Sequence, residues 1–187
     1  EMNGYGSWGR VVGDICEVLN GELKISDPDL AKRILKSFTK YAEESQEEGK
    51  QYGTMTAVCT DKLDELANSI DLFARDLILE ISKNFEEIAQ IHDLTESFPC
   101  REFLRGEQGN LLDLYDLADR CTKIPSLSKS AQNVKDMLKE AILTEYHDDG
   151  HSDAHGLTIY FPKLNPESPY LAWDPSYAAS DLDFTED

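Results

Sequence analysis

The chain has 187 residues, and its 37 acidic side chains outnumber the 18 basic ones to give a formal net charge of −19. This charge disfavours binding to nucleic acids and to anionic membranes, because both partners require clustered Lys and Arg. It attracts cations and basic polypeptides, although solubility alone also explains such a composition. No window approaches the ~18 apolar residues of a membrane span, and no signal peptide is visible. The length fits one domain or a piece of a larger one.

The N-terminal quarter of the sequence predicts an irregular segment followed by a helix. Residues 1–25 are rich in Gly, which favours irregular structure. Asp27 can cap the helix and Pro28 suits its first position. We expect the helix to fade in an acidic run and to end at Gly49. Its apolar stripe consists of side chains spaced three or four residues apart: Leu30, Ile34, Phe38 and Tyr41.

The next segment predicts a strand and a long helix. Residues 52–59 are rich in Thr and Val, and their alternation is typical of a strand. Thr60 and Asp61 can cap the helix that follows, which we expect to continue to about Ile91. Its apolar stripe is amphipathic and is formed by Leu63, Leu66, Ile70, Phe73 and Leu77.

Two further helices are predicted after a loop that begins at Pro99. The first is short and covers residues 111–121, where apolar side chains recur at helical spacing. The second is capped by Ser128 or Ser130 and carries an apolar stripe as far as Tyr146.

The C-terminal part predicts a polar loop at 147–155, a strand at 157–161 and an irregular tail at 163–187. Pro162 ends the strand, because proline cannot donate to a sheet ladder. Strands that alternate with helices indicate an α/β layer architecture. Two visible strands are fewer than the roughly four to six of a typical sheet, which suggests that the chain is part of a larger fold.

Two motifs suggest ligands but lack the expected context. Residues 4–9 fit the pattern GxGxxG, yet no strand precedes them, so we interpret them as a turn that contains aromatic residues. His147, His151 and His155 are spaced by four and alternate with aspartates, a pattern that on a helix would favour a zinc or nickel site. Gly150 and its polar neighbours favour a solvated loop instead, and we expect no metal site.

The four cysteines are distant from one another, and none forms a CxxC pair: Cys16, Cys59, Cys100 and Cys121. Zinc knuckles and thioredoxin motifs are therefore excluded. None has the local signature of a nucleophile with its base. We expect buried free thiols, because a chain of this length does not need disulfides.

Residues 152–162, which read SDAHGLTIYFP, resemble a hallmark strand of the clostripain family of cysteine peptidases, HGLSIYFP. Further stretches are similar in the same order: residues 1–8, 52–58 with 61–66, 110–118 and 182–184. The resemblance spans nearly the whole chain and implies a caspase-like layered α/β sandwich, with helices packed on a mixed sheet. It also implies a peptidase that cleaves after Arg or Lys with a Cys–His dyad and an acidic pocket.

The family's catalytic histidine loop and its Asp-Ala-Cys strand end have no counterpart in this sequence. His155 belongs to the later strand, and Cys16 follows the turn that comes after the family's nucleophile. Residues 1–187 therefore resemble the C-terminal part of one peptidase domain, with no catalytic residue of their own. The resemblance implies that Glu1 contributes to the acidic substrate pocket. Trp8 either forms a wall of that pocket or packs in its turn.

The implied partners are a preceding peptidase fragment that carries the dyad and a basic polypeptide substrate that contains Arg or Lys. No nucleic acid, membrane or cofactor is expected. The resemblance implies a bacterial protein that is secreted or held in the cell envelope. The alternative is a peptidase-like binding or structural module without a dyad, and the sequence that precedes Glu1 distinguishes the two.

Overall fold

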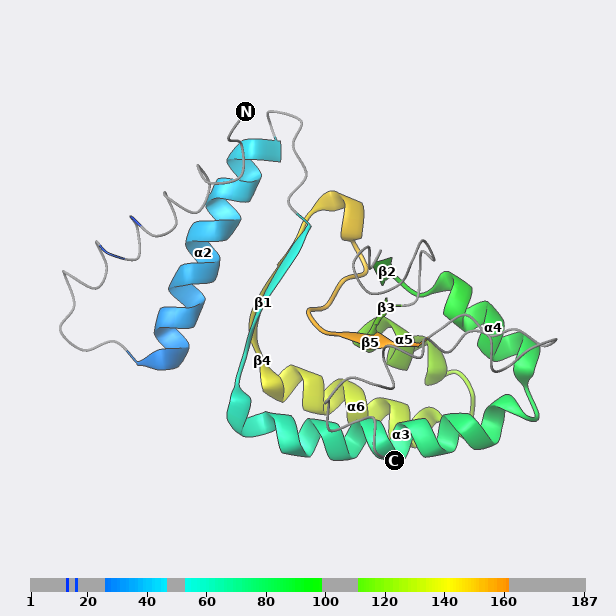
Figure 1. Cartoon of the computed structure of the whole chain (residues 1–187). Coiled ribbons are helices and arrows are strands. Elements are labelled where there is room, and N and C mark those ends of the chain that lie inside the picture. The colour runs from blue at the N-terminus through cyan, green and yellow to red at the C-terminus, as the bar shows by residue number, and fades with distance from the viewer. Residues whose placement is uncertain (1–12, 14–15, 17–25, 47–52, 99–110, 162–187) are drawn as a thin grey trace, which may run out of the picture.

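The computed structural model describes Gly13, Cys16 and residues 26–46, 53–98 and 111–161. This part of the chain is α/β, with helices packed against two small antiparallel sheets (Figure 1). In chain order the elements are α2 (Asp27–Gln46), β1 (Thr54–Val58), the 3-10 helix η1 (Thr60–Lys62), α3 (Leu63–Ile81), α4 (Phe85–Leu94), β2 (Ser97–Phe98), β3 (Leu111–Asp113), α5 (Leu114–Cys121), α6 (Ser128–Ala141), β4 (Ile142–His147), the 3-10 helix η2 (Asp149–His151) and β5 (Thr158–Tyr160).

The first sheet pairs β1 with β4 in antiparallel orientation. Strand β4 lies where the sequence predicts the end of a helix. Thr54 lies opposite His147, and the register shifts by a bulge between Ala57 and Val58. The sequence predicts helix as far as Tyr146, but α6 ends at Ala141 and the chain continues as a strand. The β-branched and aromatic side chains of β4 suit a half-buried pleated surface, and pairing with β1 decides in favour of the strand.

The second sheet has the order β2-β3-β5, with both pairs antiparallel. Its strand β5 confirms the strand predicted at 157–161. Leu111 and Leu112 were predicted to begin a helix, but they belong to β3. Helix α5 begins only at Leu114, because the side chain of Asp113 accepts a hydrogen bond from the backbone N–H of Asp116 and caps the helix.

The long helix predicted from Leu63 to Ile91 is two helices, α3 and α4. Asn84 between them has φ −127° and ψ 44°, outside the helical region. Its backbone N–H donates to the carbonyl of Glu80 at 2.9 Å, and its side-chain amide donates to the carboxylate of the same residue. The predicted cap at Thr60 and Asp61 is also wrong, since neither α3 nor η1 has a side-chain cap.

Other helix starts differ from the sequence prediction. Ser26, not Asp27, caps α2, and its hydroxyl accepts a long hydrogen bond of 3.4 Å from the N–H of Asp29. Helix α6 follows Leu127 and has no side-chain cap from a serine. Residues 1–25 were predicted irregular, but the two described positions there, Gly13 and Cys16, are helical.

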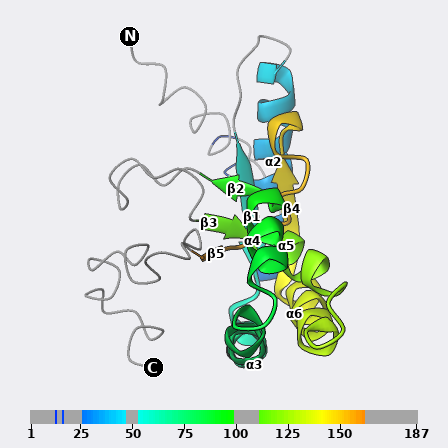
Figure 2. The ribbon, with the colours of Figure 1, turned by 90° about the vertical axis from the view of Figure 1, so that its right-hand side faces the viewer.

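Buried apolar side chains form a main core and a smaller second core. The main core lies between α3, α4, α5 and α6, and Figure 2 shows α3 and α6 side by side along one end of the molecule. Its buried members are Leu66, Phe73, Leu77, Ile88, Leu112, Leu114, Leu117, Ala118, Cys121, Ile124, Leu127, Ala131, Val134, Leu138 and Ala141.

The second core joins α2 to the β1–β4 sheet, and consists of Leu35, Ala42 and Tyr146 with half-buried Phe38 and Met55. The predicted stripe of α2 is therefore rotated by about one residue toward Leu35 and Ala42, while Leu30 and Ile34 stay half-buried. Within the described ranges, no helix is long and apolar enough to cross a membrane.

Candidate functional site

The two sheets meet at Gly156, where the side chains of Thr56 and Ile142 leave no room for a Cβ atom. Gly156 has φ +106°, a conformation that favours glycine. A Cβ atom there would lie 2.9 Å from Cγ2 and from Oγ1 of Thr56, on β1. The next residue, Leu157, accepts a hydrogen bond of 2.9 Å from the backbone N–H of Leu114. The segment that leads into β5 therefore lies close to the β1–β4 sheet and is hydrogen-bonded to the start of α5.

Beside Gly156 lies a group of charged side chains from four segments of the chain, which we call the junction cluster. Its members are Glu96, Asp113, Asp116, Arg120, Asp148, His151, Asp153 and His155. The cluster joins the approach to β2, the end of β3, helix α5 and the loop between β4 and β5.

Asp113 is the most deeply buried acid of the cluster, with 1% of its surface exposed. Its carboxylate accepts hydrogen bonds from the backbone N–H of His155 at 2.7 Å and from that of Asp116 at 2.9 Å. Burial raises the pKa of Asp113, although these two donors oppose the shift. Asp113 therefore fixes the start of α5 and ties the loop before Gly156 to it.

Asp116 and Arg120 hold the other side of the cluster. One carboxylate oxygen of Asp116 lies 2.9 Å from Nε of Arg120, one helical turn away, and the other accepts from the backbone N–H of Glu96 at 2.9 Å. Nη2 of Arg120 lies 3.7 Å from the carboxylate of Asp153. Arg120 thus carries positive charge into a group with five carboxylates.

His151 lies between carboxylates that belong to different parts of the fold. Its Nδ1 is 3.9 Å from Oδ1 of Asp148 and 4.0 Å from Oε1 of Glu96. Asp148 is 3% exposed and accepts from the backbone N–H groups of Gly53 at 2.8 Å and Gly150 at 3.1 Å. Burial raises the pKa of Glu96, opposed by His151 and reinforced by the neighbouring aspartates.

The imidazole of His155 contacts a backbone carbonyl of its own loop and the aromatic ring of Tyr115. Its Nδ1–H donates to the carbonyl oxygen of Asp153 at 2.8 Å, since that oxygen can only accept. The imidazole stacks on the ring of Tyr115, with centroids 4.6 Å apart. The ammonium groups of Lys135 and Lys139 lie over the same ring. These contacts orient the imidazole and limit its rotation.

The histidine loop is exposed to solvent only in part, and its three histidines have different partners. Among the residues that the structure describes, no group of three or more His, Cys, Asp or Glu side chains is arranged to hold a metal ion. The prediction of a solvated loop is confirmed at the exposed residues Asp149, Gly150, Ser152 and Asp153, and it is wrong at Asp148 and Ala154, which are buried. His147 stands apart from the other two histidines and pairs with Glu145 at 3.1 Å.

The described cysteines differ from one another in burial. Cys121 lies in the main core, and burial raises the pKa of its thiol to about 12, which keeps it protonated and unreactive. This confirms the predicted buried thiol. Cys59 is half-buried, whereas Cys16 is exposed, so the prediction is wrong at that position. These three cysteines are free thiols, and Cys100 lies outside the described residues.

The predicted substrate residues Glu1 and Trp8 lie outside the described part of the chain, as do the GxGxxG turn and the tail at 163–187. Sequence reasoning missed the junction cluster, because carboxylates are too frequent in so acidic a chain to stand out. Two local signals were present. Asp113 and Asp116 have the spacing of a helix cap, and Asp116 and Arg120 have that of a helical ion pair.

Comparison with protein-family models, with curated proteins and with solved structures gives no match for this chain. The functional interpretation therefore depends on the residues and their arrangement.

Proposed function

We propose that this chain is the C-terminal part of a clostripain-like cysteine endopeptidase that cleaves after Arg or Lys. The catalytic cysteine and histidine would lie on a preceding polypeptide. The observation that carries the proposal is a convergence: the described stretches that resemble the family meet at one point. The side chain of Thr56 lies where a Cβ atom of residue 156 would be, and the backbone N–H of Leu114 donates to the carbonyl of Leu157. These residues come from the stretches at 52–58, 110–118 and 152–162.

Convergence matters because unrelated local similarities have no reason to meet in space. Gly156 and the residue before it, His155, are both parts of the HGLTIYFP motif. The glycine is required by its positive φ, and the backbone N–H of His155 is bound by Asp113. The motif therefore has a packing reason at Gly156, and the hydrogen bond to Asp113 holds the backbone just before it, which supports a shared fold over a chance match.

The thiols and the sheets also support a partial peptidase. Cys121 has the raised pKa of a structural thiol, the opposite of what a nucleophile needs. The described strands form sheets of two and three strands, smaller than a typical sheet of about four to six. In this proposal, strands of the preceding polypeptide extend them into the mixed sheet of a caspase-like layered sandwich. The net charge of −19 favours a basic substrate.

The test is active-site labelling of the protein purified from its native source. A biotinylated argininyl chloromethyl ketone alkylates a catalytic cysteine when the thiolate sulfur displaces chloride from the methylene carbon. We expect the label on a second polypeptide that co-purifies with the 21.1 kDa chain. We also expect hydrolysis of an Arg-containing fluorogenic peptide, and loss of that activity after labelling.

Two controls separate catalysis from general thiol reactivity. A leucyl chloromethyl ketone should label the second polypeptide poorly, because an acidic pocket favours a cationic side chain. The variant Cys16→Ser removes the exposed thiol of this chain and should leave the labelling unchanged. A lone 21.1 kDa species without label or peptidase activity would contradict the proposal and would favour the non-catalytic binding module.

A further inference from the structure

Strand β1 has one edge that no described residue pairs. The β1–β4 sheet has two strands, so β1 is bonded to β4 on one side only. The carbonyl of Gly53 accepts from the N–H of Asp148 at 3.2 Å, and this bond fixes the alternation along the strand. Because bonded pairs alternate in an antiparallel ladder, the N–H and carbonyl groups of Thr54 and Thr56 are directed away from β4. Within the described ranges these backbone groups have no hydrogen-bond partner.

This outer edge of β1 is short and carries no charge. No residue of β1 is buried, and its sequence TMTAV contains no charged residue and no proline. Folded proteins usually protect such an edge with charges, prolines or bulges, because unpaired strands associate with other chains. Here the bulge between Ala57 and Val58 ends the regular part of the edge at Ala57. The edge therefore fits a short extended peptide better than a long strand.

Acidic side chains flank β1 at both ends. The loop after β4 contributes buried Asp148 and exposed Asp149 at the N-terminal end, where Asp148 accepts from the N–H of Gly53. At the C-terminal end three exposed acids follow the strand, and the cation among them is already paired with acids. The three acids are Asp61, Asp64 and Glu65, and the cation is Lys62. A strand edge in this setting attracts cationic partners and repels anionic ones.

We propose that the outer edge of β1 binds an extended segment of a basic polypeptide by strand addition. The N–H and carbonyl groups of Thr54 and Thr56 supply the main-chain hydrogen bonds, and the flanking acids select cationic side chains. A second copy of the chain does not fit this edge, because both copies carry a net charge of −19. The identity of the polypeptide as a peptidase substrate rests on the proposed function, whereas the strand edge itself does not.

The proposal leaves other edges for the preceding polypeptide. Strands β4, β2 and β5 are also unpaired on one side within the described part of the chain. In this proposal a strand of the preceding polypeptide extends a sheet at one of those edges, and β1 stays open for the substrate.

The test measures amide hydrogen exchange in the protein purified from its native source, together with every polypeptide that accompanies it. The probe is the peptide acetyl-Val-Dab-Val-Dab-Val-amide. Dab is diaminobutyrate, a cation shorter than Arg or Lys, so a peptidase specific for those residues should not cleave the probe. At a peptide concentration about ten times Kd, we expect about tenfold slower exchange at the amides of Thr54 and Thr56. We expect a smaller effect at Met55, whose N–H is directed at β4.

Modified peptides test the hydrogen bonds and the charge separately. A peptide N-methylated at both Dab residues keeps one free edge and should still bind. A peptide N-methylated at every backbone nitrogen has no free edge and should bind about tenfold more weakly. A peptide with Glu in place of Dab should also bind about tenfold more weakly, because the flanking acids repel it. Equal binding by all four peptides would overturn the proposal.

Charge variants test the acids that flank the strand. The double variant Asp61→Asn with Asp149→Asn should weaken binding of the Dab peptide about threefold, the size expected for exposed ion pairs. The double variant Glu86→Gln with Glu87→Gln makes the same charge change on α4 and should leave the affinity unchanged. An equal loss in both double variants would show that only the net charge of the chain matters and would overturn the role of the flanking acids.

The outcomes separate this proposal from the proposed function. Hydrolysis of an Arg-containing fluorogenic peptide, with no change at β1 when the Dab peptide is added, would overturn the strand site and leave the peptidase. Protection of Thr54 and Thr56 before any peptide is added would also overturn it, because another strand would then hold the edge. Binding at β1 without peptidase activity or a second polypeptide would support the strand site and contradict the peptidase.

Discussion

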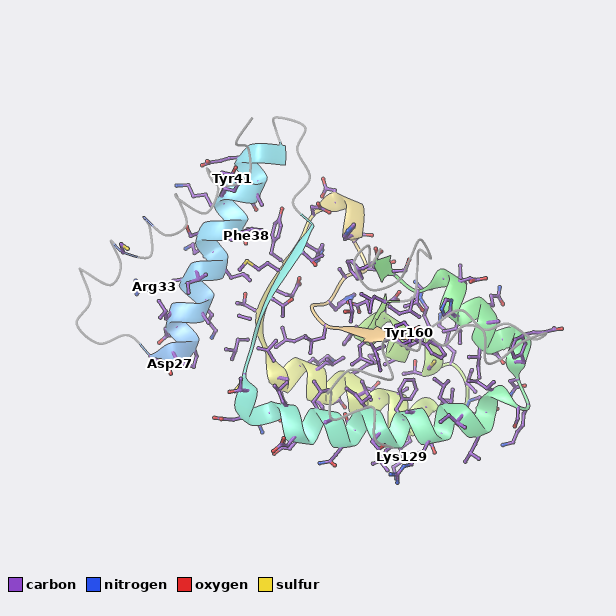
Figure 3. The ribbon with its side chains drawn as sticks, viewed as in Figure 1. Asp27, Arg33, Phe38, Tyr41, Lys129 and Tyr160 are labelled. Atoms are coloured by element: carbon purple, nitrogen blue, oxygen red, sulfur yellow. The ribbon has the colours of Figure 1, made fainter. Side chains whose placement is uncertain are left out.

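The main core and the second core differ greatly in how many parts of the chain they join. The main core brings together four helices and β3, and its central side chains, such as Leu138 and Val134, are almost completely buried. The second core holds one helix, α2, against the β1–β4 sheet through Leu35, Ala42 and Tyr146. Figure 3 shows Phe38 on the side of α2 that faces this sheet, where its ring meets Tyr146 edge-on at 5.8 Å.

Because the second core is small, we expect α2 to open independently of the other elements. Local stability follows the number of buried apolar contacts, and a helix held by a small cluster separates at low cost. The β1 strand belongs to both regions, since Met55 packs on the second core and Val58 on the main core. Loss of α2 should therefore leave β1 anchored at its C-terminal end.

The largest expected effect on stability comes from Gly156→Ala, at the point where the two sheets meet. The new Cβ clashes with Thr56, and alanine is strained at φ +106°. We expect a loss of about 4 kcal/mol in the free energy of unfolding, the sum of backbone strain and overpacking. Urea denaturation measures it.

The double variant Gly156→Ala with Thr56→Ala should recover about half of this loss, because it removes the clash but not the strain. A single Gly156→Ala variant as stable as the native chain would show that the junction is loosely packed.

A matched pair of leucine truncations compares the two cores directly. Leu138→Ala in the main core should lower the global free energy of unfolding by about 3 kcal/mol, because a cavity forms among rigid neighbours. Leu35→Ala in the second core should lower it by about 1 kcal/mol and should accelerate amide exchange mainly in α2. Equal global losses, with uniform exchange, would show that the two cores unfold as one unit.

The stabilising contributions of Asp113, which caps α5, and of Asp119, within α5, should change with pH in opposite directions. Asp113→Asn should cost about 1–2 kcal/mol, because the amide oxygen can still cap the helix but the amide nitrogen cannot accept the second hydrogen bond, from the backbone N–H of His155. Because the folded pKa of Asp113 is raised, its contribution to stability falls as pH rises, so this cost should be greater at pH 4.5 than at pH 7.5.

Asp119 is the matched control for that experiment. Its hydrogen bond from Lys135 lowers the pKa of Asp119, so its stabilising contribution is present at neutral pH and fades on acidification. The loss begins only as the pH falls below the ordinary value of 3.8 for this carboxyl group, so the cost of Asp119→Asn should be greater at pH 4.5 than at about pH 3. The effect should be small, because half of this side chain is exposed. Urea midpoints at pH 7.5 and 4.5 for Asp113→Asn, and at pH 4.5 and about pH 3 for Asp119→Asn, test the signs, and a cost that grows on acidification in both variants would contradict the assignment.

The last prediction compares the reactivity of two thiols, Cys16 and Cys121, and involves no change in the stability of the protein. Ellman's reagent should react quickly with Cys16 in the native protein, because that thiol is exposed. Cys121 should react only after unfolding, since burial raises its pKa and the main core excludes the reagent. Mass spectrometry of peptides from partly labelled protein identifies the site. Rapid native labelling of Cys121 would mean that the main core opens as readily as the second core.

The secondary-structure elements that the sequence predicts correctly are those whose pattern lies within one segment of the chain. The helices α2 and α3 and the strands β1 and β5 were found from spacing and alternation within a single segment. The strand β4 was missed because Leu138, Ile142 and Tyr146 continue the helical spacing of α6. Only the antiparallel partner β1, far away in sequence, makes that segment extended. The strands β2 and β3 are two and three residues long, too short to show alternation.

The acidity of the chain, its α/β character and the motif that leads into β5 follow directly from the amino-acid sequence. Those properties depend on composition and on neighbours within a few residues. Only the folded chain shows that Asp113 is buried, that the side chain of Thr56 lies beside Gly156, and that His151 lies between Asp148 and Glu96. Each of these depends on contacts between residues distant in the chain, and a carboxylate acquires a role only when folding removes it from water.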